Sequence, residues 1–580
     1  MINGYLKVSP SLDEQEIKKI VASFEKQFKQ EISFETVTDE KVIGGFVASI
    51  NGKVYDSSVS LGRIKAALTD NGKENGKEPI KQQSVLEYLR EKLYSTDFSP
   101  TVDDCGTVVF CADGVVHIEG LRGVKYGELL EFDGGAFGIA LDLSDLNTSA
   151  VLLDGASNVF PGLSVKRTDR VADICVGDEV LGRVIDPIGR PLDGRELRCR
   201  DFRPIEAAAP AIMDRSPVDT PLETGILAID SMIPIGRGQR ELIIGDRQTG
   251  KTSIAISAIL NQVESGVICV YCAIGQKASN VANVIHTLDA NGVLSHTVVV
   301  TAFASDSAAM QYIAPYAACA IAEQFMYQGK DVLIVYDDLS KHAAAYRSMS
   351  LLLRRPSGRE AYPGDVFYLH SRLLERAARL NKELGGGSIT ALPIVETLAG
   401  DISAYIPINV ISITDGQIYL ETELFNAGVR PAVNVGLSVS RVGRSAQSKA
   451  MKNVSKNLRL EVAQYRDMAV FAQFGADLDN TTALLLKKGE RLIEVLKQTA
   501  TERFSLAEQT CLLLAATNDI FLEDAVAVVE PKKRALLKYI KKNANAVMNS
   551  INATGELQEE TKKQLVALMK GFVYNAEEKK

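Results

Sequence analysis

The sequence predicts a multidomain α/β protein whose largest domain is built on a mostly parallel sheet. The chain has 580 residues, too many for one hydrophobic core, which indicates three or four domains. In its middle part, apolar runs of strand length alternate with stretches of helical length, as in a doubly wound α/β domain. Short β segments punctuated by glycines precede this part, and helical patterns alone follow it.

The first 78 residues are predicted to form a small α+β module. A capping-box pattern starts a helix at Ser11, and apolar residues at helical spacing continue it. Two β segments at 32–37 and 45–50 follow, and the second ends in an Asn-Gly hairpin turn. Residues 58–68 again have a helical pattern, so the predicted order is α-β-β-α.

Changes in composition place the remaining boundaries. A charged linker with Gly and Pro starts at Asp70, and residues 79–100 combine its end with a short amphipathic helix. Residues 101–170 are predicted to form a small β-barrel, 171–447 the α/β domain and 448–580 a helical domain. The strands expected in the α/β domain are the apolar runs at 242–244, 267–274, 297–302, 332–336 and 389–395.

A phosphate-binding motif lies between a strand and a helix of the α/β domain. Gly245-Asp-Arg-Gln-Thr-Gly-Lys-Thr252 fits the pattern G-x-x-x-x-G-K-[ST] at every fixed position. Gly245 and Gly250 let backbone amides curl around phosphate oxygens at a helix N-terminus, and Lys251 adds a positive charge. The hydroxyl of Thr252 can bind Mg²⁺. The alternative is a glycine-rich turn that binds nothing.

A second candidate is the carboxylate at the end of the strand Val332-Leu-Ile-Val-Tyr-Asp337. Magnesium bound to a nucleotide takes few protein oxygens, so Thr252 and Asp337 together are chemically adequate, with Asp338 as the fallback ligand. An aspartate at a strand end can instead be a helix cap.

Composition limits the remaining function classes. The chain is 46% apolar and 24% charged, and no apolar run approaches the ~18 residues that span a bilayer, so we expect it to reach a membrane only through partners. Its N-terminus resembles neither a signal nor a transit peptide, which favours the cytoplasm. The formal charge of −8 disfavours non-specific nucleic-acid binding.

Cysteine and histidine spacing predicts no redox role for Cys269 and Cys272 and no transition-metal site. The eight cysteines are scattered, and Cys269 and Cys272 lie inside an apolar run, as expected of two thiols on a buried strand. No two of the five histidines have metal-ligand spacing.

Several long segments resemble the alpha subunits of F-type rotary ATP synthases. They are 234–252 around the phosphate loop, Tyr336-Asp-Asp-Leu-Ser-Lys341, 351–365 and Ser438-Val-Ser-Arg-Val-Gly443. The resemblance runs from about residue 84 to the C-terminus. It implies a RecA-like core that binds ATP or ADP with Mg²⁺, and a membrane-associated ring of alternating alpha-type and beta-type subunits around a gamma-type shaft.

Within that resemblance, Gln276 distinguishes this chain from the catalytic beta-type subunits. In those subunits a glutamate at this place positions and polarises the attacking water. Gln276 is an amide without basic character, and loss of a general base slows such a step about 10²–10⁴-fold. The resemblance therefore implies nucleotide binding with poor hydrolysis. The alternative is that Gln276 is polar surface.

The resemblance also assigns roles to residues outside the phosphate loop. Arg441, with Ser438 in the same motif, would act in the neighbouring subunit's catalytic site as an arginine finger. Arg430, Pro431 and Gln498 would border the adenine, where Ala500 replaces a second glutamine found in many relatives. The nucleotide contacts implied in and next to the loop are Gly245, Asp246, Arg247, Gln248, Thr249, Gly250, Lys251, Thr252, Ser253 and Gln276.

The N-terminal module resembles a different subunit. Residues 8–70 are similar to the C-terminal domain of the delta subunit of the same enzyme, which joins the catalytic head to the peripheral stalk. This implies that residues 1–78 bind the stalk. The alternative is an unrelated α/β appendage.

Two other functions share the core. A self-sufficient export or secretion ATPase should carry a carboxylate at position 276. A ring-shaped RNA translocase would need an aromatic and basic N-terminal fold, and residues 1–100 contain no tryptophan and no such cluster. The sequence specifies neither the coupling ion, H⁺ or Na⁺, nor the net direction of the reaction.

Overall fold

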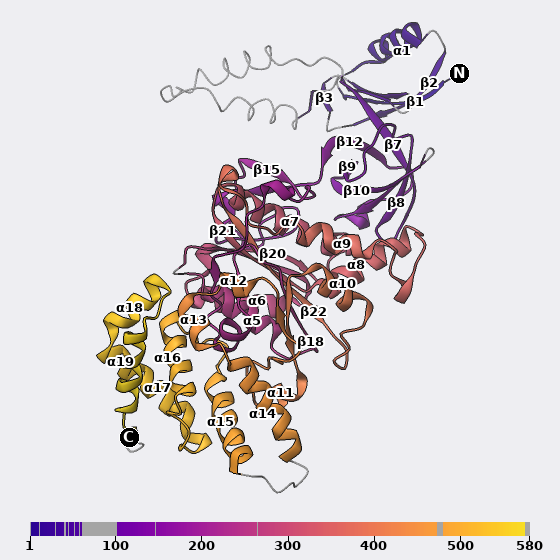
Figure 1. Ribbon diagram of the computed structural model, residues 1–580. Coiled ribbons are helices and arrows are strands. Elements are labelled where there is room, and N and C mark those ends of the chain that lie inside the picture. Colours follow the sequence, from indigo (N-terminus) through magenta and orange to yellow (C-terminus); the bar gives the residue numbers. More distant parts are fainter. Residues whose placement is uncertain are drawn as a thin grey trace, which may run out of the picture. The chain divides into compact units, whose positions relative to one another are not determined.

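The computed structural model of the protein separates into two compact units, residues 1–172 and 173–580 (Figure 1). The structure describes residues 2–10, 12–28, 31–39, 42–44, 46–50, 53–56, 59–60, 101–144, 147–263, 265–472 and 480–574.

The first unit contains a six-stranded barrel, as predicted. Its strands follow one another in the order β12-β9-β10-β11-β8-β7, and pairing of β12 with β7 closes it. Leu130, Phe132 and Val165 point to a fully buried core because alternate residues of each strand face inward. The strands are β7 (Thr101–Ala112), β8 (Val115–Glu119), β9 (Glu128–Phe132), β10 (Ala136–Leu143), β11 (Asn147–Leu152) and β12 (Ser164–Val171).

The N-terminal module is a small sheet covered by one helix. The sheet has the order β5-β4-β1-β2, and the aromatic ring of Phe24 in the helix lies 5.3–5.9 Å from those of Phe34, Phe46 and Tyr55. The elements are β1 (Ile2–Val8), α1 (Glu14–Phe28), β2 (Ile32–Thr38), β3 (Val42–Gly44), β4 (Phe46–Ile50), β5 (Lys53–Asp56) and β6 (Val59–Ser60).

Two features of the module differ from the expected α-β-β-α order. β1 and β3 were not expected, and β1 lies between β2 and β4 in the sheet. Residues 59–60, where a helix was expected, form a strand that pairs with β3. The rest of that predicted helix, the linker and the short helix before the barrel lie outside the described residues.

The module and the barrel share backbone pairing. β5 pairs antiparallel with the first residues of β7, so that Tyr55 is opposite Val102. The linker predicted to start at Asp70 is therefore not the only connection between the module and the barrel. Hydrogen bonds along a shared ladder fix the register of the two parts.

The second unit is organised around an eight-stranded sheet with the order β14-β20-β19-β21-β22-β18-β23-β24. All pairs are parallel except β23 with β24, which confirms the predicted α/β core. The strands are β14 (Val184–Ile185), β18 (Glu241–Gly245), β19 (Ile268–Gln276), β20 (Thr297–Phe303), β21 (Asp331–Asp337), β22 (Ser388–Glu396), β23 (Gly416–Leu420) and β24 (Val439–Ser440).

Helices cover this sheet, and short strands lie beside it. Cys269 and Cys272 of β19 are free thiols exposed by 1% and 0%, as expected for a buried strand. The helices are α4 (Leu227–Met232), α5 (Lys251–Leu260), α6 (Ala278–Ala290), α7 (Ala308–Tyr327), α8 (Leu339–Leu352), α9 (Val366–Leu374), α10 (Tyr405–Ile413) and α11 (Thr422–Asn426). The other strands are β13 (Asp173–Val176), β15 (Asp201–Pro204), β16 (Pro221–Leu222) and β17 (Ile235–Gly236).

The C-terminal part is helical, as predicted, and its centre is α16. Every residue from Leu506 to Ala515 is buried, and the capping box of Ser505 and Glu508 fixes the start of this helix. The helices are α12 (Gly443–Ala446), α13 (Lys449–Val454), α14 (Leu458–Ala472), α15 (Asn480–Leu496), α16 (Leu506–Thr517), α17 (Val526–Asn543), α18 (Asn545–Thr554) and α19 (Glu559–Lys570). None of the described helices is long and apolar enough to cross a bilayer.

Candidate nucleotide-binding site

The phosphate-loop motif lies between β18 and α5, in the strand-loop-helix setting that it requires. A Cβ atom on Gly245 would lie 2.5 Å from the carbonyl oxygen of Leu420, so only glycine fits there. Gly250 has φ +94° and caps α5, and Gln248 has φ +63°. These left-handed residues curl the loop so that its amides face the start of the helix, which is a favourable place for an anion.

Lys251 carries a buried positive charge inside the loop. The residue is 6% exposed, and its Nζ donates to the carbonyl oxygens of Gly245 at 2.9 Å and Asp246 at 2.5 Å. Burial lowers the pKa of Lys251, and nearby carboxylates, Glu396 first among them, oppose that shift. A buried ammonium held by neutral carbonyls gains when an anion such as phosphate approaches it.

Thr252 and Asp337 lie together, as the sequence predicted. Thr252 Oγ1 donates to Asp337 Oδ2 at 2.8 Å, and the hydroxyl of Tyr271 donates to the same oxygen at 2.8 Å. Asp337 is 3% exposed, and burial raises its pKa against hydrogen bonds from Tyr271 and Thr252 that favour the charged form. A hydroxyl beside a carboxylate is the hard oxygen set that suits Mg²⁺.

Asp338, the fallback ligand, has a different task. Its side chain accepts from the backbone N–H of Lys341 at 2.8 Å and is the N-cap of α8. It also pairs with Lys341 Nζ at 2.9 Å. Burial raises the pKa of Asp338 to about 6, and Lys341 works against that shift. The helix-cap interpretation therefore fits Asp338 and not Asp337.

Gln276 ends β19 beside Asp337. Its Nε2 donates to Asp337 Oδ1 at 2.9 Å. The side chain is therefore engaged at the site and is not polar surface. Because Asp337 uses this amide N–H, the position presents a hydrogen-bond donor to the carboxylate where a glutamate would present a second negative charge.

The remaining loop side chains point to several neighbours. Asp246 accepts from Thr397, the Gly400 N–H and Thr422 at 2.6–3.0 Å, and these bonds lower its pKa although burial acts to raise it. Asp246 thus ties the loop to adjacent segments, and its negative charge is unsuited to contacting phosphate.

Arg247 and Gln248 are exposed, whereas Thr249 is buried. Arg247 Nε lies 3.0 Å from Glu396 in an exposed ion pair. Thr249 Oγ1 donates to the carbonyl of Asp246 at 2.8 Å. Of these three side chains, the two exposed ones are free to turn toward a bound phosphate.

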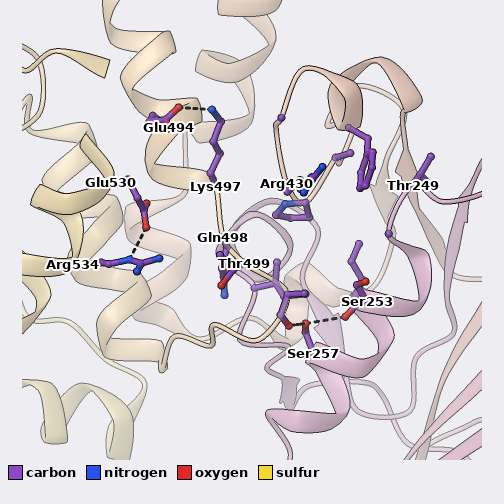
Figure 2. Close-up of a pocket in the computed structure, with 18 residues that line it drawn as sticks. Thr249, Ser253, Ser257, Arg430, Glu494, Lys497, Gln498, Thr499, Glu530 and Arg534 are labelled. Atoms are coloured by element: carbon purple, nitrogen blue, oxygen red, sulfur yellow. Dashed lines mark hydrogen bonds and ion pairs between the residues drawn. The ribbon is translucent and has the colours of Figure 1, made fainter. Parts of the chain in front are cut away.

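A cavity of about 480 Å³ opens next to the loop (Figure 2). Its volume is within the range of small-molecule sites. The guanidinium of Arg430 stacks over the ring of Phe425 at 4.5 Å. The residues that line the cavity are Ile226, Thr249, Gly250, Ser253, Ile254, Ser257, Phe425, Gly428, Arg430, Pro431, Ala432, Glu494, Lys497, Gln498, Thr499, Ala500, Glu530 and Arg534.

Gln498 lines this cavity, but its polar atoms are already used. Its Nε2 donates to the carbonyls of Gly225 at 2.7 Å and Glu502 at 2.6 Å, and its Oε1 accepts from the Leu227 N–H at 3.0 Å. Gln498 therefore shapes the cavity wall and has little left for hydrogen bonds to a base. Ala500 offers only its carbonyl, which accepts from Ser257 Oγ at 2.6 Å.

Sequence reasoning missed four charged residues of the outer wall. Glu494 pairs with Lys497 at 2.6 Å, and Arg534 pairs with Glu530 at 2.8 Å (Figure 2). Glu494 lies on α15 and Lys497 directly after it, and Glu530 and Arg534 lie on α17. No local motif marks them, because only the packing of these helices beside the loop brings them to the cavity.

Arg441 lies at the end of the sheet opposite the phosphate loop, whereas Ser438 lies beside Tyr419 near the middle of β23. Gly416, the first residue of β23, pairs with Ser440, whereas the last residue of β23 pairs with Gly245. Arg441 lies opposite Asp415 and is therefore about 16 Å along the strand from the residue that pairs with Gly245. Its side chain is exposed and has no ion-pair partner among the described residues.

Ser438 is completely buried. Its Oγ donates to the Asn434 carbonyl at 2.6 Å and accepts from the Tyr419 N–H at 2.9 Å. Ser438 thus holds the segment that carries Arg441 and does not itself reach outward. The structure does not bring either residue to the phosphate loop of the same subunit.

Four family models match the protein. The ATP synthase delta (OSCP) subunit matches residues 2–68, and the beta-barrel domain of the ATP synthase alpha/beta family matches 102–169. The nucleotide-binding domain of that family matches 225–440, and its C-terminal domain matches 447–572.

Curated relatives match over most of their length. ATP synthase subunit alpha of Acetivibrio thermocellus is 57% identical over 488 residues, which cover 84% of this chain and 96% of the relative. The subunit of the same name from Caldanaerobacter subterraneus is 56% identical over 489 residues, 84% of this chain and 97% of the relative. That from Dehalococcoides mccartyi is 54% identical over 485 residues, 83% and 96%.

Proposed function

The chain belongs to the ATP synthase alpha/beta family, among its F-type alpha subunits, and on that premise we propose that it binds Mg-ATP at its own loop without turning it over usefully. It works as a subunit of an ATP synthase complex with other subunits. This membership sets aside an export ATPase and an RNA translocase.

Binding of the phosphates rests on the loop between β18 and α5. Backbone amides near Gly250 and the buried ammonium of Lys251 attract the phosphate oxygens, and Arg247 and Gln248 can add contacts from outside. Thr252 and Asp337 would hold Mg²⁺, which, when bound, offsets negative charge on the phosphates.

The observation that carries the proposal is the amide of Gln276 against Asp337. An amide cannot take a proton from water, so the nucleotide stays intact while it is bound. Removing general-base assistance costs about 10²–10⁴-fold in rate.

We assign the catalytic contribution of this subunit to Arg441. It is exposed, lacks an ion-pair partner among the described residues and lies away from its own loop, which suits a guanidinium that enters the site of an adjacent beta-type subunit. There it would stabilise charge on the transferring phosphoryl group. Ser438 supports it by holding the segment in place.

Base recognition is proposed to be mainly by shape. Pro431 and Gln498 border the cavity, and the hydrogen bonds of Gln498 to the backbone leave Arg430, Lys497 and the paired carboxylates as the polar groups nearest a base. Hydrogen bonds from Gln498 and from position 500 would then contribute little to the affinity for adenine.

The wider assembly is part of the proposal. The protein would alternate with beta-type subunits around a gamma-type shaft, at the cytoplasmic face of the membrane, through partners that conduct H⁺ or Na⁺. Residues 1–78 would bind the peripheral stalk and 79–100 would connect them to the barrel (101–170), the nucleotide domain (171–447) and the helical domain (448–580).

The test separates binding from catalysis. The protein is reconstituted with its beta-type partner as wild type and as Arg441→Ala, and ATPase activity and bound nucleotide are measured. We expect the variant ring to lose at least ~10³-fold in turnover while nucleotide stays on the alpha-type subunit. Rapid hydrolysis by the purified alpha-type subunit alone, or a fully active variant ring, contradicts the assignment.

A further inference from the structure

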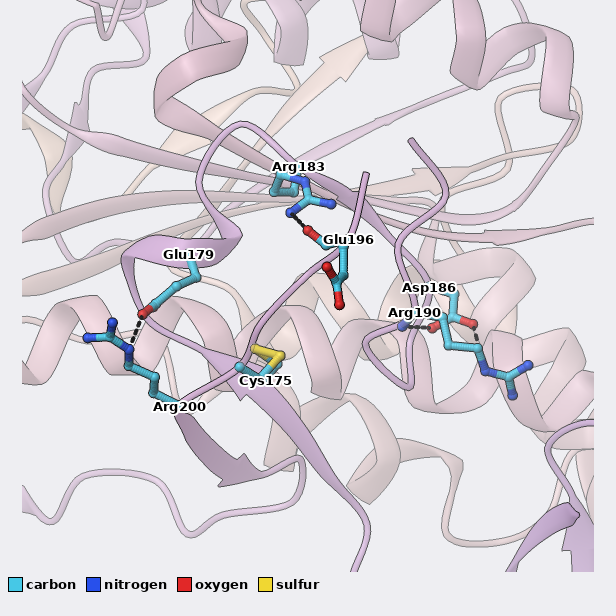
Figure 3. Close-up of a disulfide and its surroundings, with 8 residues drawn as sticks. Cys175, Glu179, Arg183, Asp186, Arg190, Glu196 and Arg200 are labelled. Carbon is cyan, nitrogen blue, oxygen red and sulfur yellow. Dashed lines mark hydrogen bonds and ion pairs between the residues drawn. A yellow bond between two sulfur atoms is a disulfide. The ribbon is translucent and has the colours of Figure 1, made fainter. Parts of the chain in front are cut away.

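A disulfide crosses the start of the second unit (Figure 3). It joins Cys175 on β13 to Cys199, which lies just before β15, and the two Cα atoms are 5.6 Å apart. It is the only disulfide among the residues that the structure describes. Cys175 is 2% exposed, whereas Cys199 is partly exposed in a loop whose neighbouring residues are largely exposed.

Cys199 has the surroundings of a reactive sulfur. Arg198 and Arg200 flank it, with side chains 87% and 86% exposed, and the pair Arg200 and Glu179 at 3.7 Å leaves that arginine mostly in solvent. Positive charge beside a thiol stabilises its thiolate, which is the form that exchanges with disulfides.

For most of the other cysteines, burial raises the pKa of the thiol. Burial raises the pKa of Cys319 to about 11 and that of Cys511 to about 12, and it also raises those of Cys111, Cys269 and Cys272. These thiols stay protonated at neutral pH and are unreactive. The disulfide between Cys175 and Cys199 differs from these thiols, because one of its sulfurs lies in a partly exposed position between two arginines.

The disulfide joins a ribbon in which β13 is buried and β15 is mostly exposed, with Ile174 and Val176 of β13 each 1% exposed. β13 and β15 form a sheet of only two strands, with Cys175 opposite Phe202, and Phe202 is 56% exposed. Isolated two-stranded ribbons are marginally stable in water. Arg203 of β15 also contacts α7, because its Nε donates to Glu323 at 3.0 Å and its guanidinium lies 4.9 Å from the ring of Tyr327.

The loop between the two cysteines reaches the nucleotide sheet. Its strand β14 is the edge of that sheet and pairs with β20. Arg183 bonds Asp193 at 2.6 and 2.9 Å and so fastens the loop internally. Since β14 and the loop around Arg183 have these bonds of their own, loss of the disulfide would increase the mobility of β13 and β15 more than that of β14.

We propose that Cys175 and Cys199 form a reversible redox modification site whose exchange partner is a dithiol. The oxidised form, with the disulfide closed, stabilises the pairing of β13 with β15. A dithiol thiolate attacks Cys199 Sγ, the bond to Cys175 Sγ breaks, and Cys175 leaves as a thiolate that takes a proton. The second thiol of the reagent then attacks its own sulfur in the mixed disulfide and releases Cys199. The protein gains two electrons and two protons, and the dithiol loses them.

The test uses the full-length protein and dithiothreitol as the dithiol. The folded protein is equilibrated at graded ratios of reduced to oxidised dithiothreitol, alkylated with iodoacetamide and mapped by peptide mass spectrometry, with amide hydrogen exchange measured in parallel. Cys175 and Cys199 should become alkylated together in one transition. Amides of residues 173–176 and 201–203 should then exchange about tenfold faster, with the nucleotide sheet unchanged.

Two variants distinguish the local effect of the disulfide on β13 and β15 from a general loss of structure. Cys199→Ser should show the fast ribbon exchange at every ratio, and Cys111→Ser should behave as wild type. Alkylation of both sulfurs without any reductant overturns the proposal, as does a disulfide that resists dithiothreitol until the whole protein unfolds. Reduction without faster exchange in the ribbon overturns it as well.

Discussion

The hydroxyl of Thr252 donates a hydrogen bond to the carboxylate of Asp337, and these two groups are proposed to hold Mg²⁺. Removing the hydroxyl tests that role. Thr252→Val keeps the side-chain shape and removes the oxygen. We expect affinity for ATP to fall about tenfold when Mg²⁺ is present, roughly the value of one hydrogen bond or ligand contact, and to change little without Mg²⁺. Fluorescence titration with and without the ion measures both values.

Thr287→Val is the matched control, because Thr287 Oγ1 bonds only the Asn283 carbonyl of its own exposed helix turn. It should bind nucleotide as the wild type does. If Thr252→Val loses affinity equally with and without Mg²⁺, the hydroxyl supports the loop and does not serve the metal.

Glu223 provides a pH-dependent prediction. Burial and then the charge of Asp230 raise the pKa of Glu223 to about 7, against the pull of Arg237. The native state therefore binds this proton more tightly than the unfolded state does, so the stability it contributes is complete below about pH 4.5 and is lost as pH rises through 7. Glu223→Gln stays neutral, so it should match the wild type near pH 5 and melt about 2–4 °C higher near pH 8.

Scanning calorimetry at both values checks this. Asp338, whose pKa burial raises to about 6, changes stability in the same direction in both proteins and cancels in the comparison. Glu196→Gln, with a side chain 77% exposed, is the control and should leave the melting curve unchanged. An identical melting temperature for Glu223→Gln and wild type at pH 8 would rule out this role for Glu223.

The proximity of Thr252 and Asp337 was predictable from the sequence, whereas roles that depend on hydrogen bonds outside the motifs were not. Thr252 and Asp337 could be placed together because the carboxyl ends of parallel strands meet at one edge. Gln498 was expected to border the adenine and does line the cavity, but its bond to the Gly225 carbonyl, 273 residues away, is not indicated by any local pattern. Ser438 was expected to act with Arg441, but its hydroxyl is buried and bonded to the backbone of Asn434 and Tyr419.

At the scale of elements, the N-cap of α16 is expected to contribute to the stability of the C-terminal domain. Ser505 Oγ accepts from the Glu508 N–H, and Glu508 accepts from the Ser505 N–H at 2.8 Å. Ser505→Ala removes half of this cap and should cost about 1 kcal/mol of unfolding free energy. Denaturant unfolding measures it, and Ser550→Ala on an exposed turn of α18 should cost nothing measurable. Equal stability of the two variants would show that packing alone fixes the start of α16.

Long periodic elements were predictable from local pattern, and short paired ones were not. The strands of the nucleotide sheet are continuous apolar runs buried on both faces, which sequence alone reveals. β14 and β24 are two residues long and exist only because a neighbour pairs with them. β1 carries Asn, Gly and Lys within seven residues, and pairing on both sides overrides that weak preference.

At the scale of the whole molecule, the chain combines segments that resemble two different subunits of the enzyme. The family models match a delta (OSCP) segment and alpha/beta domains in one polypeptide. Because β5 pairs with β7, the module shares a sheet ladder with the barrel and is not joined through a linker alone. Covalent fusion keeps such a module at high local concentration beside the head, which strengthens a modest affinity for a stalk helix.

Removal of residues 1–78 from the assembled enzyme tests this role. The truncated protein keeps the closed barrel and the nucleotide core, so the isolated head should hydrolyse ATP within about twofold of the wild type, because no stator is needed for hydrolysis alone. In membrane vesicles the same complex should lose most ATP-driven ion pumping, since the head would turn with the shaft. ATPase activity, pumping and the melting temperature of the ring are measured on the same preparation, and the melting temperature shows whether the uncovered residues 101–104 of β7 disturb assembly. Pumping that survives the deletion with a normally assembled ring would mean that the module is not the stator link.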